Sequence, residues 1–345
     1  MRVLLTGAAG FIGSTIARML DDDGHEVVAV DVLLPEAHRH PVAGPGLHRL
    51  DVRDAARWAH LLDGVDAVCH QAALVGAGVT VADMPAYAAH NDLGTAALLA
   101  AMAERDVRRL VLASSMVVYG EGRYACEEHG RVAAPQRSVA ALAAGDFDHR
   151  CPACQRALRW EPIDESARLD PRSSYAASKV AQEHYAAAWA RQADGAVVAL
   201  RYHNVYGPGM PRDTPYAGVA AIFRSALERG DAPRVFEDGG QVRDFVHVDD
   251  VARANLAALS DVATRETGAL AAYNVASGSP VTILDVARLV GRGEGPAPSV
   301  TGEWRAGDVR HVVASPARAA AELGFTAAVD PAQGLPAFAT APLRD

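Results

Sequence analysis

The sequence has almost no lysine, little cysteine and no long apolar run. Of its 33 basic residues, only Lys179 is a lysine. Four cysteines in 345 residues are too few for the disulfide framework of a small secreted protein. No stretch approaches the ~18 consecutive apolar residues of a membrane-spanning helix, and the apolar start runs into Gly7 too early for a signal peptide. We therefore expect a cytoplasmic protein that does not bind a membrane.

Positive charge is scarce as well. The net charge is −9 at pH 7, and the chain contains no basic block. A protein that tracks nucleic-acid phosphates needs a basic surplus, so we expect no nucleic-acid partner. With 50% hydrophobic and 22% charged residues the composition is that of a globular protein, which excludes a disordered chain. At about 150 residues per domain, the length predicts roughly two domains.

The first two thirds of the chain alternate between strand and helix patterns. An apolar run at 3–5 ends in a glycine-rich turn, helical spacing follows at 14–20, and a second apolar run covers 26–31, the order of a βαβ unit. Further strands are predicted at residues 67–70, 110–113, 197–200 and 245–248, and helices at 93–104 and 176–189. This alternation predicts an α/β fold with a doubly wound parallel sheet.

Three glycines after the first strand have the spacing of a phosphate-binding turn. Gly7, Gly10 and Gly13 permit a tight turn and close approach of a pyrophosphate, and the following helix offers free N–H groups at its positive end. Asp31 ends the next strand, where its carboxylate can accept both ribose hydroxyls of NAD but would repel the 2′-phosphate of NADP. The pattern therefore predicts NAD as cofactor, with a plain tight turn as the alternative.

A tyrosine and the only lysine lie four residues apart on a predicted helix. Positions i and i+4 share one helix face, so Tyr175 and Lys179 are expected side by side, with Lys179 lowering the pKa of the phenol towards that of a general base. Ser115 follows a buried strand, where ligands of open α/β sheets bind, and can donate to a substrate oxygen. We predict that Ser115, Tyr175 and Lys179 are catalytic. The alternatives are a solvated helix face and a serine that caps the strand end.

Together these motifs resemble the extended short-chain dehydrogenase/reductase superfamily, within it the NAD-dependent nucleotide-sugar epimerases and dehydratases. Further matching segments are His70-Gln71-Ala72-Ala73, Asn91-Asp92-Leu93-Gly94-Thr95, residues 201–208, residues 240–250 and Arg305-Ala306-Gly307-Asp308. The resemblance implies a Rossmann fold, a nucleotide-diphosphate sugar substrate and a homodimer. The cofactor contacts then expected are Gly7, Gly10, Phe11, Ile12, Gly13, Asp31, Asp51, Val52, Ala72, Ala73, Asn91, Tyr175, Lys179 and Tyr202. The expected substrate contacts are Ser115, Asn204, Arg243, Arg305 and Asp308.

The resemblance also bears on the reaction. Met116 and Val117 stand where dehydratases of this family carry an Asp-Glu pair, and neither can transfer a proton, which counts against a dehydratase. An epimerase at C4 is implied, and residues 203–211 and 215–219 look most like the branch that acts on dTDP-L-rhamnose. A UDP-hexose 4-epimerase and an NAD(P)-dependent 4-keto-sugar reductase stay open. A non-catalytic NAD-binding protein is disfavoured because Tyr175 and Lys179 are both present.

Three of the four cysteines lie in one segment with zinc-ligand spacing. Cys126-x-x-His129 and Cys151-x-x-Cys154 are two pairs separated by a loop, as in a zinc ribbon. The segment has few large apolar residues, so a metal can supply its missing folding energy. We predict a structural zinc ion with these four ligands. A redox-active cysteine pair, or unliganded thiols beside a solvated histidine, are the alternatives.

These patterns divide the chain into interwoven parts. Residues 1–120 are expected to form the dinucleotide-binding Rossmann domain, 121–163 an inserted zinc-ribbon-like module, and 164–201 the remainder of the Rossmann domain with the catalytic helix. Residues 202–345 are expected to form mainly a smaller α+β substrate domain, with 242–260 returning to the Rossmann domain.

Overall fold

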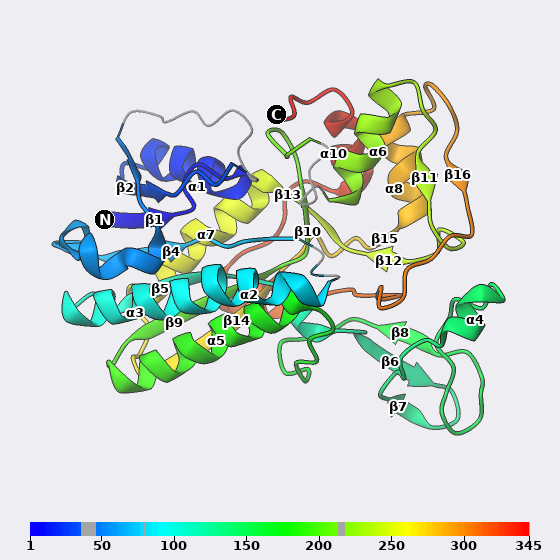
Figure 1. Ribbon diagram of the computed structural model, residues 1–345, viewed down its shortest axis with the longest axis horizontal. Coiled ribbons are helices and arrows are strands. Elements are labelled where there is room, and N and C mark those ends of the chain that lie inside the picture. Colours follow the sequence, from blue (N-terminus) through cyan, green and yellow to red (C-terminus); the bar gives the residue numbers. More distant parts are fainter. Residues whose placement is uncertain (36–45, 77, 79, 213–217, 345) are drawn as a thin grey trace.

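A seven-stranded parallel sheet forms the centre of the larger lobe (Figure 1). The computed structural model describes residues 1–35, 46–76, 78, 80–212 and 218–344. The strands stand in the order β14-β9-β5-β4-β1-β2-β3. Their bounds are β1 (Arg2–Thr6), β2 (Glu26–Asp31), β3 (Leu47–Arg49), β4 (Ala67–His70), β5 (Arg109–Ser115), β9 (Ala196–Tyr202) and β14 (Ala269–Val275). The expected α/β fold with a parallel sheet is confirmed.

Helices cover both faces of this sheet. One face packs against α1 (Phe11–Asp22), α7 (Val248–Val262) and α9 (Ala317–Leu323). The other carries the 3-10 helices η1 (Val52–Arg57) and η2 (Ala59–Leu62) and the helices α3 (Gly94–Glu104) and α5 (Ser174–Gln192). The short helices η3 (Val81–Asp83), α2 (Met84–Tyr87) and η4 (Ala88–Leu93) lead into α3. Because both faces are buried, the central strands are apolar along their length instead of alternating.

Two strands differ from the sequence-based expectation. The strand predicted at 245–248 is β13 (Phe245–His247), and it pairs with β10 (Asn204–Tyr206) in a separate two-stranded sheet. The edge strand β14 was not predicted, because its Ala-Leu-Ala-Ala start lacks the β-branched residues typical of strands. The part of the chain that returns to the Rossmann sheet after residue 202 therefore extends beyond 242–260.

The second lobe, called the substrate lobe below, comprises the residues after 202 that lie outside this sheet and its helices. Its core lies between the helices α6 (Val219–Glu228), α8 (Ile283–Gly291) and α10 (Pro331–Phe338). Two strand pairs complete it, β11 (Arg234–Val235) with β16 (Ser299–Val300) and β12 (Val242–Arg243) with β15 (Val281–Thr282). Residues 215–217, part of the resemblance described above, lie outside the described residues.

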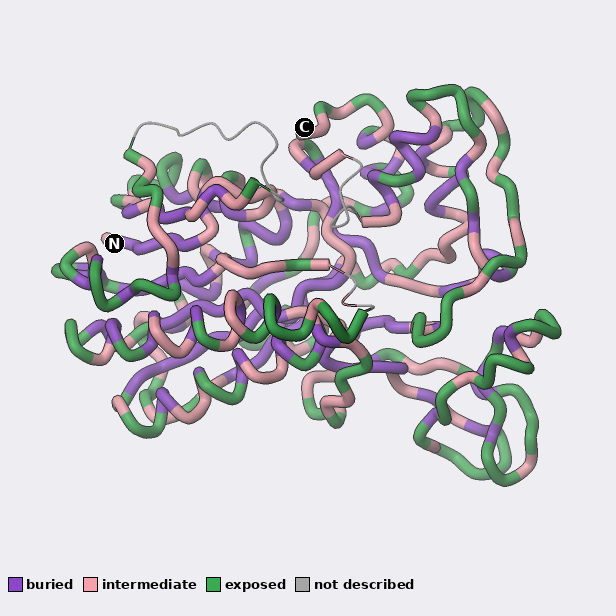
Figure 2. Tube along the Cα trace, viewed as in Figure 1, coloured by how far each residue is buried: buried purple, intermediate pink, exposed green. Residues whose placement is uncertain are grey.

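The insertion, residues 121–163, projects from the molecule beside the substrate lobe (Figure 1). Its sequence shows no strand period, yet it forms a three-stranded antiparallel sheet in the order β7-β6-β8. The strands β6 (Arg123–Cys126), β7 (Gly130–Val132) and β8 (Arg159–Glu161) are too short to display a period, and α4 (Val139–Ala143) is a single turn. Figure 2 shows the insertion as mostly exposed around a thin buried core, to which Tyr124, Cys126 and Cys151 belong.

None of the helices in the described part of the chain combines the length and the apolar character needed to cross a bilayer.

The substitution Gly13→Ala tests the packing of α1 on β1. A methyl group at Gly13 would lie 2.0 Å from the carbonyl oxygen of Gly7, a backbone atom that cannot rotate away. Overpacking of this kind costs about 1–3 kcal/mol, and a rigid backbone neighbour places it at the upper end, so we expect a loss of at least about 2 kcal/mol in the free energy of unfolding. Urea titration followed by circular dichroism measures it.

Gly291→Ala is the matched control. Gly291 ends α8, and its added methyl group would meet only the Leu227 side chain at 3.8 Å. Because alanine favours helix over glycine, the unfolding midpoint of this variant should stay unchanged or rise. Equal midpoints for the two variants would contradict the close approach at Gly13.

Candidate active site

The carboxyl ends of the central strands surround a cavity of about 730 Å³. Its wall is built by the segments that follow β1, β2 and β4 and by the ends of β5 and β9, and the substrate lobe contributes Met210, Ile222 and Arg305. The chain reverses direction across the sheet between β1 and β4, and ligands of open α/β sheets bind at such a switch point. The cavity is therefore the candidate active site.

The glycine turn after β1 has the form that a pyrophosphate requires. Gly7 has a φ of +69°, and a methyl group there would lie 2.7 Å from the backbone nitrogen of Ala72. Gly10 is the N-cap of α1, and because it has no side chain it leaves the N–H groups of the first turn uncapped and facing the cavity. The first turn of α1 also carries no acidic residue. Open N–H groups at the positive end of a helix form an anion site, so the residues present fit a dinucleotide.

Asp31 stands at the rim of the same cavity. Its carboxylate accepts the backbone N–H of Ala9 at 3.0 Å and that of Leu33 at 2.8 Å, which fixes it beside the glycine turn. The side chain of Arg344 donates to the carbonyl oxygen of Ala9 at 2.5 Å and lines the cavity as well. The sequence offered no signal for Arg344, because it comes from the far end of the chain.

Ser115, Tyr175 and Lys179 meet at the cavity wall. Ser115 ends β5, while Tyr175 and Lys179 lie in the first turns of α5, whose N-cap Ser173 accepts the N–H of Ala176. The Nζ atom of Lys179 lies 5.9 Å from the centre of the Tyr175 ring and donates to the carbonyl oxygen of Ala113 at 2.9 Å. Ser115 also accepts the N–H of Val117 at 3.4 Å, so it caps the 3-10 helix η5 (Met116–Tyr119) while facing the cavity.

Burial shifts the pKa values of both Tyr175 and Lys179. Burial raises the pKa of Tyr175, and only the hydrogen bond with Ser115 opposes the rise appreciably. Burial lowers the pKa of Lys179 to about 8, and the nearby charge of Glu183 opposes that shift. The ammonium of Lys179 bonds to a backbone carbonyl and not to the phenol, so its effect on the pKa of Tyr175 stays a prediction.

A buried ion pair lies behind the catalytic helix. Arg201 makes a two-pronged contact with the carboxylate of Glu183, through Nε at 2.9 Å and Nη2 at 2.7 Å. The Ser114 hydroxyl donates to the same carboxylate at 2.5 Å, and the remaining nitrogen of Arg201 donates to Tyr119. Buried pairs of this geometry are costly to break because one charge is left unpaired. The network fixes α5 against β5 and β9, and so holds Tyr175 relative to Ser115.

Most of the residues expected at the site line the cavity, but three do not. Asn91 is buried beneath it, and its amide bonds to both the N–H and the carbonyl of Leu74, so it holds the lining segment in place. Arg243 donates to the carbonyl oxygens of Val309 and Arg310. Asp308 is also absent from the wall. Lining residues that were not among the expected contacts include Gln71, Leu74, Val75, His90, Ser114, His203, Met210 and Arg344.

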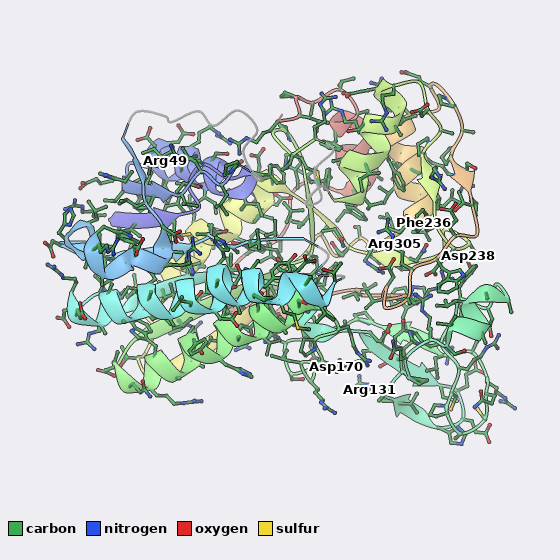
Figure 3. The ribbon with its side chains drawn as sticks, in the orientation of Figure 1. Arg49, Arg131, Asp170, Phe236, Asp238 and Arg305 are labelled. Atoms are coloured by element: carbon green, nitrogen blue, oxygen red, sulfur yellow. The ribbon has the colours of Figure 1, made fainter. Side chains whose placement is uncertain are left out.

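Arg305 reaches the cavity from the substrate lobe. Its guanidinium stacks over the Phe236 ring at 4.9 Å, and Figure 3 shows the two side chains together. Asn204 lines the cavity nearby and donates to the carbonyl oxygen of Asp244 at 2.9 Å. The substrate lobe thus presents a cation and an amide towards the catalytic group.

The four expected metal ligands come together in the insertion. Their ligand atoms all lie within 4.8 Å of one another. The sulfur of Cys126 is 3.5 Å from Nδ1 of His129 and 3.6 Å from the sulfur of Cys154, and the sulfur of Cys151 is 3.7 Å from the same nitrogen.

Comparison with known proteins gives consistent matches. The model of the NAD dependent epimerase/dehydratase family matches residues 3–139 and 152–293, leaving out part of the insertion. The dTDP-L-rhamnose 4-epimerase of Burkholderia thailandensis is 37% identical over 338 residues, which cover 94% of this chain and 90% of that protein. The Thermus thermophilus UDP-glucose 4-epimerase, solved with NAD, has a TM-score of 0.76 at 31% identity and 98% coverage of both chains. The UDP-N-acetylglucosamine 4-epimerase of Methanobrevibacter ruminantium has a TM-score of 0.78 at 27% identity, covering 98% of this chain and 96% of that chain.

The lone lysine makes its own titration measurable. Protein labelled only with ¹³C-lysine gives a single side-chain signal by NMR, because the chain has one lysine. We expect the Cε shift of Lys179 to titrate with a midpoint near 8, since burial disfavours the ammonium. A midpoint near the ordinary lysine value of about 10.4 would contradict the burial of this side chain. The matched control is the free amino acid, titrated in the same buffer.

Proposed function

The chain belongs to the NAD dependent epimerase/dehydratase family, and we propose that it inverts C4 of a nucleotide-diphosphate sugar through a transient 4-keto intermediate. The observation that carries this proposal is the meeting of Ser115, Tyr175 and Lys179 at the wall of the cavity that the glycine turn opens into. A hydroxyl donor, a phenol and an ammonium beside a dinucleotide site can orient a carbinol and move its proton, while the bound cofactor would supply the hydride chemistry.

Each of the three side chains has a separate task. Tyr175 removes the proton of the sugar's 4-hydroxyl and later returns it, while Ser115 donates to the same oxygen. Because burial raises the pKa of Tyr175, proton removal needs added positive charge, and the ammonium of Lys179 contributes part of it. Gly7, Gly10, Gly13 and Asp31 would hold NAD, which when bound would supply the hydride chemistry at C4 and the positive charge of an oxidised nicotinamide.

Two features favour an epimerase over the other reactions of this fold. Met116 and Val117, which head η5 directly after Ser115, cannot transfer the protons that loss of water requires. Asp31 faces the cavity with its carboxylate, which favours NAD over the NADPH that a 4-keto-sugar reductase would consume.

The substrate is proposed from the sequence relatives. The curated relative at 37% identity is named for dTDP-L-rhamnose, and the aligned region covers nearly the whole chain. We therefore assign dTDP-L-rhamnose, or a related 6-deoxyhexose, as the substrate. A UDP-hexose is the second candidate, favoured by the fold match to a UDP-glucose 4-epimerase. Asn204 and Arg305 at the cavity wall would contact the sugar and the diphosphate.

Two copies of the chain are proposed to pair through the face formed by α3 and α5, which lie side by side in Figure 1. The apolar side chains of Leu93 and Met84 are 56% and 50% exposed where the chain enters α3. Burying such side chains against a second copy would remove them from water.

A product assay without added cofactor tests the function. Purified protein is incubated with a panel of dTDP- and UDP-sugars, and we expect dTDP-L-rhamnose to convert to its C4 epimer. Tyr175→Phe should lower turnover by at least about 100-fold, the usual effect of losing a general base, while NAD content stays the same. Tyr185→Phe on the same helix is the matched control, since that ring is 48% exposed. Full activity in Tyr175→Phe, or a reduced sugar accumulating with NADPH consumption, would refute the mechanism.

The cluster in the insertion is proposed to hold a structural zinc ion. Bonds of about 2.3 Å to sulfur and about 2.0–2.1 Å to nitrogen place tetrahedral ligands about 3.5–3.8 Å apart. Three of the separations in the cluster, 3.5, 3.6 and 3.7 Å, fall in that range. Cys126, His129, Cys151 and Cys154 provide four protein ligands, which leave no open position for water. The ion would therefore stabilise the insertion instead of taking part in the reaction.

Metal analysis checks the zinc site. Protein purified without chelator should contain about one zinc ion per chain, as four protein ligands complete one tetrahedral site. Cys154→Ser should lose the zinc, whereas Cys69→Ser should keep it, because Cys69 lies in β4 of the central sheet. Zinc-free protein whose three insertion thiols react freely in the folded state would refute the site.

A further inference from the structure

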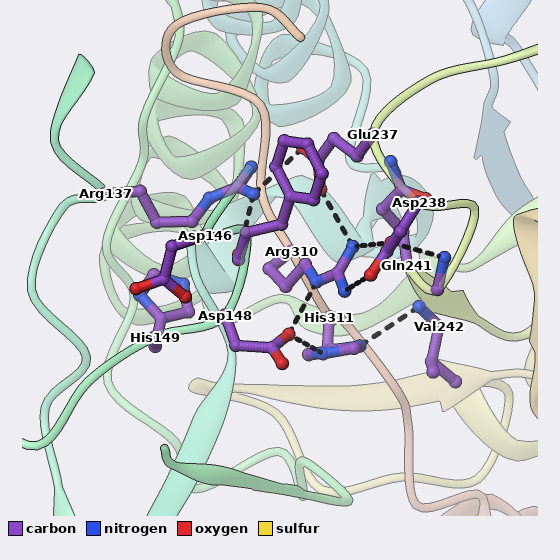
Figure 4. A network of polar contacts seen from close by, with 12 residues as sticks. Arg137, Asp146, Asp148, His149, Glu237, Asp238, Gln241, Val242, Arg310 and His311 are labelled. Carbon is purple, nitrogen blue, oxygen red and sulfur yellow. Dashed lines mark hydrogen bonds and ion pairs between the residues drawn. The ribbon is translucent and has the colours of Figure 1, made fainter. Parts of the chain in front are cut away.

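A chain of alternating charges joins the insertion to the substrate lobe. Arg137 and Asp148 belong to the insertion, and Glu237, Asp238 and Arg310 belong to the substrate lobe. Figure 4 shows their side chains in one continuous network. Neither the family resemblance nor the reaction described above uses these contacts.

Arg137 contributes a buried side chain to this network. Its side chain is 4% exposed, and it bonds to the carboxylate of Glu237, itself 2% exposed, at 2.9 Å. It also donates to the carbonyl oxygen of Phe147 at 3.0 Å and to that of Asp308 at 2.6 Å. One guanidinium therefore links the insertion, the substrate lobe and the turn that carries Arg305.

Glu237 holds the other end of that turn. Its backbone N–H donates to the carbonyl oxygen of Glu303 at 2.7 Å, and its carbonyl accepts the N–H of Gly302 at 3.2 Å. Its second carboxylate oxygen bonds to Arg310 at 2.9 Å. The segment 303–308 is thus fastened at its start through Glu237 and at its end through Arg137, and Arg305 lies between the two fastenings.

Arg310 and Asp148 brace the same connection. The Nε of Arg310 donates to Asp148 at 3.0 Å, and its two terminal nitrogens bond to Asp238 at 2.7 and 2.8 Å. The Phe147 ring lies 5.9 Å from the guanidinium carbon of Arg310. The insertion and the substrate lobe are therefore joined by oriented hydrogen bonds from both Arg137 and Arg310.

The insertion also lines a second cavity next to the turn 303–308 and the start of the catalytic helix. Its residues Glu121 and Gln136 line this cavity of about 490 Å³, together with Gly307 and with Ser174 at the start of the catalytic helix. Desolvation raises the pKa of Asp308, and the charges of Arg305, Arg243 and Arg137 all oppose that rise. The charge of Arg137 therefore acts on Asp308 together with those of Arg305 and Arg243.

We propose that Arg137 is a positioning residue for substrate binding: by bonding to Glu237 and to the Asp308 carbonyl, it fixes the turn 303–308 so that Arg305 is held ready for the diphosphate. This deepens the proposed function and depends on it for the identity of the ligand. The insertion then acts on substrate affinity without touching the reacting atoms.

The role predicts which kinetic constant changes. Ser115, Tyr175 and Lys179 are held by the central sheet and by the Glu183–Arg201 pair, and Arg137 contacts none of them. Loosening the turn weakens binding of the nucleotide in ground state and transition state alike, which raises KM and leaves kcat unchanged.

Two measurements on Arg137→Met test the proposal. Hydrogen–deuterium exchange of the 302–310 backbone amides should become about tenfold faster, since this side chain makes the fastening at Asp308 and also bonds to Glu237. KM for dTDP-L-rhamnose should rise about tenfold with kcat within about twofold. Arg137→Lys keeps the positive charge but loses the planar guanidinium, so it should give intermediate values for both the exchange rate and KM. If Arg137→Met does not fold, Asp148→Asn, whose side chain is 50% exposed, should show a smaller change in the same two quantities.

Arg131→Met is the control within the insertion. Arg131 forms a surface pair with Glu161 and is 69% exposed, so exchange and KM should match the wild type. Unchanged exchange at 302–310 in Arg137→Met would overturn the proposal, as would a fall in kcat with KM unaltered. The hydrogen–deuterium exchange measurement needs no substrate, so it tests the role of Arg137 even if the wild type epimerises no sugar in the panel. That lack of activity would refute the proposed function but not the role of Arg137 in holding the turn.

Discussion

All seven central strands run in the same direction, and this parallel order decides where chemistry can occur. Their carboxyl ends lie at one edge, so the glycine turn, Asp31, Ser115 and Tyr202 reach one cavity although they lie far apart in the sequence. The edge strand β14 runs in the same direction and covers the side of β9, so it leaves the arrangement of the carboxyl ends unchanged. The substrate lobe and the insertion approach the same edge from outside, and each supplies side chains that the sheet lacks.

Burial explains why this chain keeps one lysine among so many arginines. Lys179 is 3% exposed, with Glu183 and Arg201 buried behind it. An ammonium there is small and can lose its proton near neutral pH, whereas a guanidinium keeps its charge and needs room for a planar fork. Arg201 has that room, because the Glu183 carboxylate accepts two parallel bonds. The two cations on either side of Glu183 are therefore not interchangeable.

Local patterns made much of the site predictable. The glycine turn, Asp31 and the Tyr175–Lys179 pair depend on spacing along one strand or one helix, and the structure brings all of them to the cavity. Arg344 and Arg137 could not be found in this way, since their partners lie 335 and 171 residues away. The burial that raises the pKa of Tyr175 could not be inferred from spacing, and only the packed fold shows that the ammonium of Lys179 bonds to Ala113. Strand β14 was missed because its start lacks β-branched residues, and its pairing with β9 is visible only in the folded sheet.

The ends of the insertion lie side by side. Arg123 at the start of β6 stands opposite Glu161 at the end of β8, and an ion pair from Arg123 to Asp164 closes the loop at its base. The entropic cost of closing a loop grows with the number of free residues in it. Because the insertion is paired at its base, the cost of connecting β5 to α5 is that of a short loop. The distance between Ser115 and Tyr175 is therefore insulated from the length of chain between them. The connection between β5 and α5 can therefore contain an insertion of a different length or sequence. The residues that bind the nucleotide can then change while Ser115 and Tyr175, which move the proton, keep their positions.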